Sequence, residues 1–130
     1  MLGAEVTHVG PSTLLDPRLD VQRCTDLDQI IGDVDVLYML RMQNERMDAA
    51  PVPPGGEYTR RFGLTPERAA NIRADALLMH PGPINHGTEM TVDPSTLSQS
   101  AITDQVGYGV AVRMAVLFDL LGTGEMEEES

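Results

Sequence analysis

The stretch 76–90, ALLMHPGPINHGTEM, contains the most distinctive corner of the sequence. Its apolar start predicts a buried strand over 77–80, and the residues Pro81-Gly82-Pro83 end that strand abruptly. Because neither proline carries an N–H, this corner offers three carbonyl acceptors and one donor. A hydrogen-bond donor, such as an amide or an amine, is the ligand group that suits it. A cis bond before Pro83 would help to aim the carbonyls.

A second apolar run, VDVLYML (34–40), is typical of a strand that is covered on both faces in a parallel sheet. Arg41 and Gln43 follow it and are two residues apart, so in extended chain they point the same way. A guanidinium beside an amide suits a carboxylate, although an arginine at a strand end is also commonly solvated or ion-paired. Ligands of open α/β sheets bind beyond the carboxyl ends of strands, so the two exits together predict an amino-acid site.

The rest of the chain alternates strand and helix patterns. Further strands are expected over 3–10 and 21–24. Helices are expected over 25–32 (with Thr25 as N-cap), 44–50, 57–62, 65–73 (with Thr65 as N-cap and proline at the first helical position) and 98–121. Gly107 and Gly109, inside the last helix, suggest close packing against another backbone. This order predicts an α/β three-layer sandwich with a mostly parallel, Rossmann-like sheet and a long C-terminal helix.

The composition of the chain argues against some classes of binding partner and leaves others possible. A chain of 130 residues has the length of one domain, and its net charge of −11 argues against a nucleic-acid partner. No unbroken apolar run approaches the ~18 residues of a membrane span, and no basic segment starts a signal peptide, so we expect no membrane partner. The single cysteine, Cys24, excludes an internal disulfide and fits a cytoplasmic protein. All nine cationic side chains are arginines, which leaves anionic small molecules as possible ligands.

Metal and cofactor signals are weak. The three histidines and Cys24 have no metal-ligand spacing, and no glycine-rich phosphate loop is present, so we expect neither a metal nor a cofactor. Cys24 is expected to be a small buried apolar residue. The acidic segment 123–130 is expected to be a disordered tail.

Three segments together resemble the aspartate/ornithine-binding domain of the carbamoyltransferase family. They are DVLYMLRMQNERM (35–47), LLMHPGPINHGTEM (77–90) and SAITDQVGYGVAVRMAVLFDLL (100–121). GAEVTHVGPSTLLDP and EYTRRFGLTPER are also similar, so the resemblance covers nearly the whole chain. The His-Pro-Gly-Pro corner resembles the aspartate-specific members, whereas ornithine-specific members typically carry Cys-Leu-Pro there.

The resemblance implies a role for each candidate residue. Arg41 would bind an aspartate carboxylate with Gln43 assisting, and the carbonyls of Gly82 and Pro83 would receive the carbamoyl NH₂ and the attacking amine of the reaction with carbamoyl phosphate. The family's scheme has no metal and no covalent enzyme intermediate, so catalysis would come from positioning and charge stabilisation. Complete family members assemble as homotrimers.

The departures from the family pattern matter as well. The carbamoyl-phosphate half and the domain's opening strand and helix have no counterpart here, His86 stands where an arginine is expected, and Met1 falls in mid-domain. We therefore expect residues 1–122 to be an aspartate-binding domain, truncated at its start, without catalytic residues of its own. Its uncovered strand edge and helix face predict self-association.

Two alternatives remain open at the level of sequence. The chain could be a non-catalytic remnant that binds or scaffolds a full-length carbamoyltransferase or a pathway partner, which the loop PVPPGG (51–56) and His86 favour slightly. It could also belong to a carbamoyltransferase that acts on another amino acid.

Overall fold

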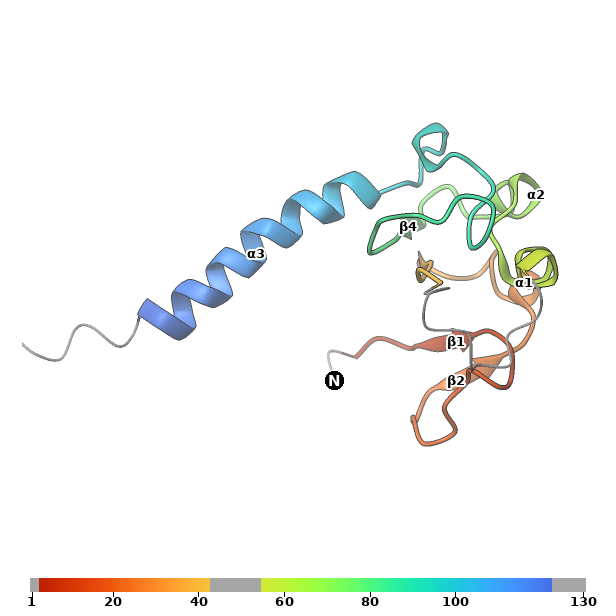
Figure 1. Cartoon of the computed structure of the whole chain (residues 1–130), viewed down its shortest axis with the longest axis horizontal. Coiled ribbons are helices and arrows are strands. Elements are labelled where there is room, and N and C mark those ends of the chain that lie inside the picture. Colours follow the sequence, from red (N-terminus) through yellow and green to blue (C-terminus); the bar gives the residue numbers. More distant parts are fainter. Residues whose placement is uncertain (1–2, 43–54, 123–130) are drawn as a thin grey trace, which may run out of the picture.

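The computed structural model describes residues 3–42 and 55–122. The elements follow in the order β1 (Thr7–Val9), β2 (Gln22–Cys24), the 3-10 turn η1 (Leu27–Gln29), β3 (Val36–Tyr38), α1 (Gly55–Phe62), α2 (Pro66–Ala69), β4 (Leu77–Met79), the 3-10 turn η3 (Pro94–Thr96) and α3 (Ile102–Gly122) (Figure 1). Parallel strands are combined with helices and a long helix ends the described chain, which confirms the predicted α/β class. The segments 44–50 and 123–130, for which a helix and a tail were predicted, lie outside the described residues.

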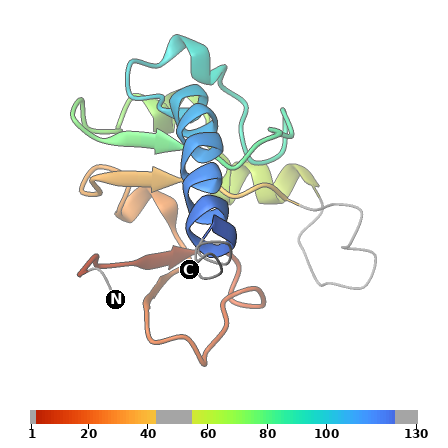
Figure 2. The ribbon, with the colours of Figure 1, turned by 90° about the vertical axis from the view of Figure 1, so that its left-hand side faces the viewer.

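The strands form two parallel pairs. β1 pairs with β2, and β3 pairs with β4 in the register Val36↔Leu77 to Tyr38↔Met79. Figure 2 shows β1, β3 and β4 pointing the same way, with β1 set apart from β3. Within the described residues no ladder joins the two pairs, so the single sheet that we expected is present as two halves. Each strand is also shorter than the segment predicted for it, because only three residues of each pair in a ladder.

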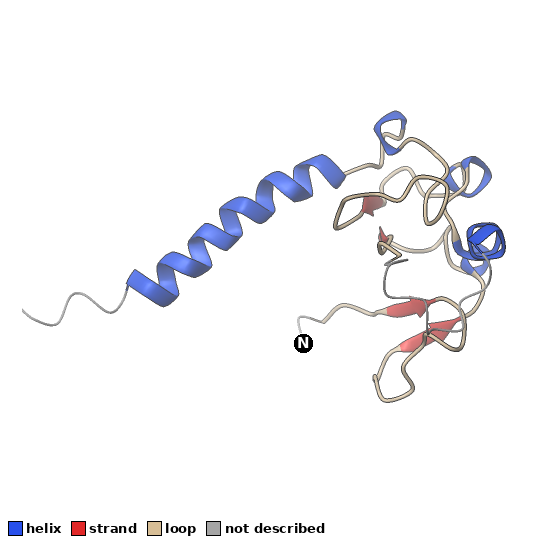
Figure 3. Cartoon of the chain, viewed as in Figure 1, coloured by secondary structure: helices blue, strands red, loops and turns tan. Residues whose placement is uncertain are grey.

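The core lies between the pair β3–β4 and the short helices. Leu64, Leu78 and Met90 are fully buried, and Ile31 from the segment after η1 joins them. Figure 3 shows the short helices on one side of the strands, whereas α3 projects away from the other side. The apolar residues of the strands and of the short helices therefore pack into one hydrophobic core.

Local capping explains two helix starts. Thr65 caps α2 as predicted, with its side chain accepting from the Arg68 N–H and Pro66 at the first position, although the helix ends at Ala69. The N-cap predicted at Thr25 is wrong, because Asp26 caps η1 and its carboxylate accepts the Asp28 N–H at 3.0 Å. The element there is one 3-10 turn instead of a longer helix.

α3 is the least covered element. None of its 21 residues is buried, and Phe118 is 80% exposed. The close packing expected at Gly107 and Gly109 is absent among the described residues, where an added Cβ would meet nothing within 4 Å. By length and composition α3 could also span a membrane, which the sequence reading did not anticipate. The same composition is typical of a helix that packs against a protein surface.

Candidate functional site

The exits of β3 and β4 lie side by side. Because the two strands are paired in parallel, the chain leaves both at the same edge, and the Met39 N–H still donates to the Met79 carbonyl at 2.9 Å beyond the ladder. Arg41 and the Pro81–Pro83 corner therefore follow neighbouring strand ends. The Gly82–Pro83 bond is cis, as the sequence predicted, and both prolines are exposed. Gln43 lies outside the described residues.

Arg41 has an unusual polar environment. Its side chain is partly buried, and its Nε is buried without a hydrogen-bond partner among the described residues. An unsatisfied buried donor typically costs about 1–3 kcal/mol, more when the group is charged. A ligand oxygen, in particular a carboxylate, would satisfy it.

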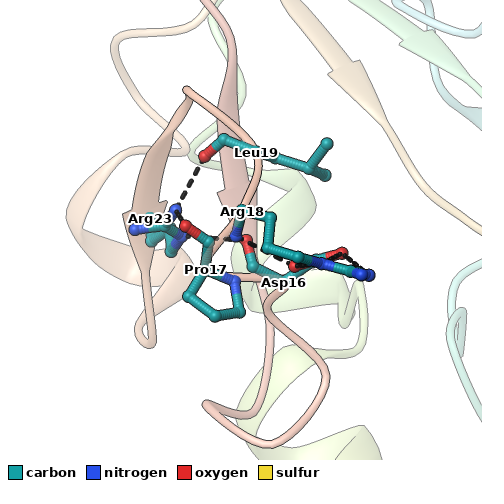
Figure 4. Close-up of polar contacts among 5 residues, drawn as sticks. All are labelled: Asp16, Pro17, Arg18, Leu19 and Arg23. Carbon is teal, nitrogen blue, oxygen red and sulfur yellow. Dashed lines mark hydrogen bonds and ion pairs between the residues drawn. The ribbon is translucent and has the colours of Figure 1, made fainter.

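Other arginines are held by local contacts. Arg23 donates from Nη2 to the carbonyls of Pro17 and Leu19 at 2.8 and 2.7 Å, which closes the loop between β1 and β2 (Figure 4). In the same loop Arg18 pairs with Asp16 at 2.7 Å and lowers the pKa of that carboxyl. Both are structural cations of the surface, in contrast to Arg41 beside the proline corner.

Arg68 also differs from Arg41, because it is largely buried and its guanidinium has hydrogen-bond partners. Its guanidinium forms two hydrogen bonds to the Asp28 carboxylate, at 2.7 and 3.0 Å, and a third to the Gly63 carbonyl at 2.8 Å. The side-chain hydrogen bonds from Arg68 lower the pKa of Asp28. This fork joins η1 to α2 and supports the fold behind the site.

A buried His–Glu pair stands directly behind the corner. His80 and Glu89 are both 0% exposed, and His80 Nε2 lies 3.2 Å from Glu89 Oε1. The Gly82 N–H donates to His80 Nδ1 at 2.8 Å, so Nδ1 is an acceptor and the ring proton belongs on Nε2, where it faces the carboxylate. The pair thus connects the corner's main chain to Glu89.

Glu89 and Asn85 also reach the β3 exit. Glu89 Oε1 accepts the Asn85 N–H at 2.7 Å, and Oε2 accepts the Met42 N–H at 3.5 Å. Asn85 Nδ2 donates to the Met42 carbonyl at 2.6 Å. Sequence reasoning did not single out Glu89 or Asn85, because neither has a periodic position. The sequence offered one signal for Glu89. It is an isolated acid between the uncharged Thr88 and Met90, and the next charged residue along the chain is Asp93.

Neighbouring helices close around this pair. Burial raises the pKa of Tyr58 on α1, and the negative charge of Glu89 adds to the rise. At the start of α3, Gln105 accepts the His80 N–H at 3.0 Å and donates to the Tyr38 hydroxyl at 2.9 Å. Helix α3 is therefore fastened to the site at its first turns.

Two further expectations from the sequence concern His86 and metal binding. His86, which stands where the family pattern has an arginine, is exposed at the turn after the corner. Hydrogen bonds from Ser95 lower the pKa of Asp93, and His86 adds to that effect. Among the residues that the structure describes, no group of three His, Cys, Asp or Glu side chains could hold a metal ion. The residue types at the corner fit an organic ligand.

Comparison with known proteins identifies the domain. The family model described as "Aspartate/ornithine carbamoyltransferase, Asp/Orn binding domain" matches residues 1–120. The aspartate carbamoyltransferase catalytic subunit of Thermobifida fusca is 46% identical over 124 residues, covering 93% of this chain and 40% of the relative.

Solved structures agree with this match. The aspartate transcarbamoylase of Trypanosoma cruzi in complex with carbamoyl phosphate superposes with a TM-score of 0.64 at 28% identity, covering 75% of this chain and 30% of that one. Its complex with aspartate and phosphate gives a TM-score of 0.58 at 27% identity, covering 75% and 27%. The chain thus spans about two fifths of the length of the curated relatives that it matches. It belongs to the aspartate/ornithine carbamoyltransferase family, as an Asp/Orn-binding domain.

Proposed function

We propose that this chain is the aspartate-binding part of an aspartate carbamoyltransferase. The reaction transfers the carbamoyl group of carbamoyl phosphate to L-aspartate, with phosphate leaving, in cytoplasmic de novo pyrimidine synthesis. The observation that carries the proposal is the buried Nε of Arg41, which has no hydrogen-bond partner among the described residues, at the strand edge where the proline corner also emerges. Relatives named as aspartate carbamoyltransferases, and the aspartate and carbamoyl phosphate in the solved T. cruzi complexes, support this substrate pair.

Each candidate residue has a definite task in this proposal. Arg41 binds an aspartate carboxylate and Gln43 assists. The carbonyls of Gly82 and Pro83 accept hydrogen bonds from the carbamoyl NH₂ and the aspartate amine, so the amine nitrogen is held against the carbamoyl carbon. Holding two reactants in this way replaces a bimolecular encounter and can lower the barrier by about 7–11 kcal/mol in favourable systems.

The isolated chain, on this proposal, binds aspartate but transfers nothing. Its residues supply the amino-acid side of the site. The Thermobifida fusca relative is about two and a half times as long, and the solved T. cruzi enzyme binds carbamoyl phosphate as well. The complete protein would be a homotrimer, and the exposed face of α3 favours self-association of this chain.

Binding by the isolated chain tests the proposal directly. We expect L-aspartate to shift, in a saturable way, the ¹⁵N NMR signals of the Arg41 Nε–H and of the amides of His80, Gly82, Ile84 and Asn85, with L-ornithine as the competing amino acid. Arg41→Ala should abolish the effect and Arg113→Ala, an exposed arginine on α3, should preserve it. No saturable shift, or one that survives Arg41→Ala, would overturn the proposal.

Activity gives an independent test. We expect no carbamoyl-aspartate from the purified chain, and detectable product would contradict its proposed inactivity. In a completed protein, Arg41→Ala should raise KM for aspartate and lower kcat, because a carboxylate clamp both binds and orients. If the completed protein forms a carbamoylated product other than carbamoyl-aspartate, the alternative of a carbamoyltransferase that acts on another amino acid is favoured.

A further inference from the structure

We propose that Glu89 and Asn85 are positioning residues that hold the Arg41-bearing segment in register with the proline corner. This inference rests on the proposed function and deepens it, because it names the groups that align the two halves of the amino-acid site. Neither side chain needs to touch the ligand. Both act through the main chain of Met42, which is the residue directly after Arg41.

The first step is the burial of Glu89. A carboxylate removed from water is stable only when hydrogen-bond donors surround it. Glu89 is 0% exposed, and its donors come from three places: the Asn85 main chain at 2.7 Å, the His80 ring at 3.2 Å and the Met42 main chain at 3.5 Å. Burying the Glu89 carboxylate is costly, and its three donors come from separate segments. Glu89 therefore links those segments to one another.

The second step is the continuity of the contacts. From the corner, the Gly82 N–H donates to His80 Nδ1, and His80 Nε2 faces Glu89. From Glu89 the contacts pass to Asn85, whose Nδ2 donates to the Met42 carbonyl at 2.6 Å. The main chain on both sides of the site is therefore connected through a buried polar network, in which each member limits the movement of the next.

The third step is the comparison with ordinary packing. A purely structural polar pair would join elements of the core, whereas this one joins two strand exits, 43 residues apart in sequence at the contact between Asn85 and Met42. One exit carries the Arg41 Nε, for which the described part of the chain supplies no hydrogen-bond partner, and the other carries the cis Gly82–Pro83 corner. Misplacement of catalytic or binding groups by about 1 Å is enough to lose two orders of magnitude in rate.

Two substitutions separate the contacts. Asn85→Ala removes the bond to the Met42 carbonyl but keeps the Asn85 N–H on Glu89. Glu89→Gln keeps an acceptor oxygen for His80 and Asn85, and places an NH₂ group opposite the Met42 N–H, where two donors repel each other. Asn71→Ala, an exposed asparagine of the same domain, is the matched control.

The experiment uses the 130-residue chain and three measurements. These are the Kd for L-aspartate by NMR titration, the urea midpoint, and amide hydrogen exchange at Met42 compared with Leu78. We expect Asn85→Ala and Glu89→Gln to weaken aspartate binding at least about tenfold, the effect of one lost hydrogen bond to or through a charged group. We also expect Met42 exchange to accelerate at least about tenfold, while the urea midpoint of Asn85→Ala stays at that of Asn71→Ala.

The outcomes distinguish the two proposals. If the wild-type chain fails to bind aspartate, the proposed function falls, and Met42 exchange alone then decides the positioning role. If Met42 exchange in Asn85→Ala equals that in Asn71→Ala, the positioning role is overturned whatever the affinity. A loss of affinity that merely follows a loss in the urea midpoint overturns it as well.

Discussion

Gly63→Ala is the substitution for which the structure predicts the sharpest loss of stability. An added Cβ at Gly63 would lie 2.6 Å from the Thr59 carbonyl oxygen and 3.0 Å from the Thr88 carbonyl oxygen. Real Cβ atoms are essentially never found at the shorter of these distances. Both obstacles are main-chain atoms, so no side-chain rotation can relieve the contact.

The surroundings of Gly63 also prevent a shift of its own backbone. Its N–H donates to the Thr59 carbonyl at 2.9 Å, and its carbonyl accepts from Arg68 at 2.8 Å. The next residue, Leu64, donates its N–H to the Glu89 carbonyl at 2.9 Å. Overpacking at such a position costs about 1–3 kcal/mol. The lower entropy of alanine in the unfolded chain returns about 0.4–1 kcal/mol, so we expect a net loss of about 1–2 kcal/mol.

Urea unfolding followed by circular dichroism measures this loss. With a slope of about 1–3 kcal/mol per molar urea, the midpoint should fall by about 0.3–2 M. Gly107→Ala is the control, because it places the same methyl group in open space on α3, where alanine is the better helix former by about 1 kcal/mol. If Gly63→Ala leaves the free energy of unfolding within about 0.5 kcal/mol of the wild type, the crowding argument is refuted.

Further predictions concern the polar contacts and the exposed helix. Because Arg68 lowers the folded-state pKa of Asp28, the stability from this pair is present above the ordinary pKa of about 3.9 and is lost as the pH falls through the lower folded value. The urea midpoint of the wild type should therefore fall more steeply below about pH 4 than that of Asp28→Asn, and equal slopes would contradict the linkage. At pH 7 Asp28→Asn should cost only about 1 kcal/mol, since Asp28 is 57% exposed and partly screened by water. Thr65→Ala removes the N-cap of α2 and should lower the free energy of unfolding by about 1 kcal/mol, measured in the same way. Phe118→Ser should reduce self-association in sedimentation velocity because Phe118 is 80% exposed, whereas Arg113→Ser should not, and equal sedimentation of both variants would remove Phe118 from the contact.

Local patterns account for the parts of the fold that were predicted. The apolar runs before Arg41 and before Pro81 are strands, and the three- and four-residue spacing in 102–121 is a helix, because each signal needs only its own residues. The Thr65-Pro66 start of α2 is similarly local. Parallel pairing of β3 and β4 follows from the strand–helix order.

The features that were missed depend on distant contacts. Asp26 caps η1 in place of Thr25, and nothing in the local pattern ranked the two side chains. Glu89 and Asn85 become a junction only when Met42 is brought to them, and no spacing in the sequence encodes that approach. The proposed roles of Arg41, Gly82 and Pro83 in binding remain predictions of the family resemblance and of the strand exits.

The contact between the Gly82 N–H and His80 has a consequence for the polarity of the corner. Pro81 and Pro83 have no N–H, and the remaining donor is already occupied by the imidazole at 2.8 Å. The main chain there offers only lone pairs to a visiting molecule. On the proposed function, an amino acid would approach in one orientation, with its ammonium end toward the oxygens and its acid groups turned to the arginine. The backbone itself would then sort the two ends of the molecule before any chemistry begins.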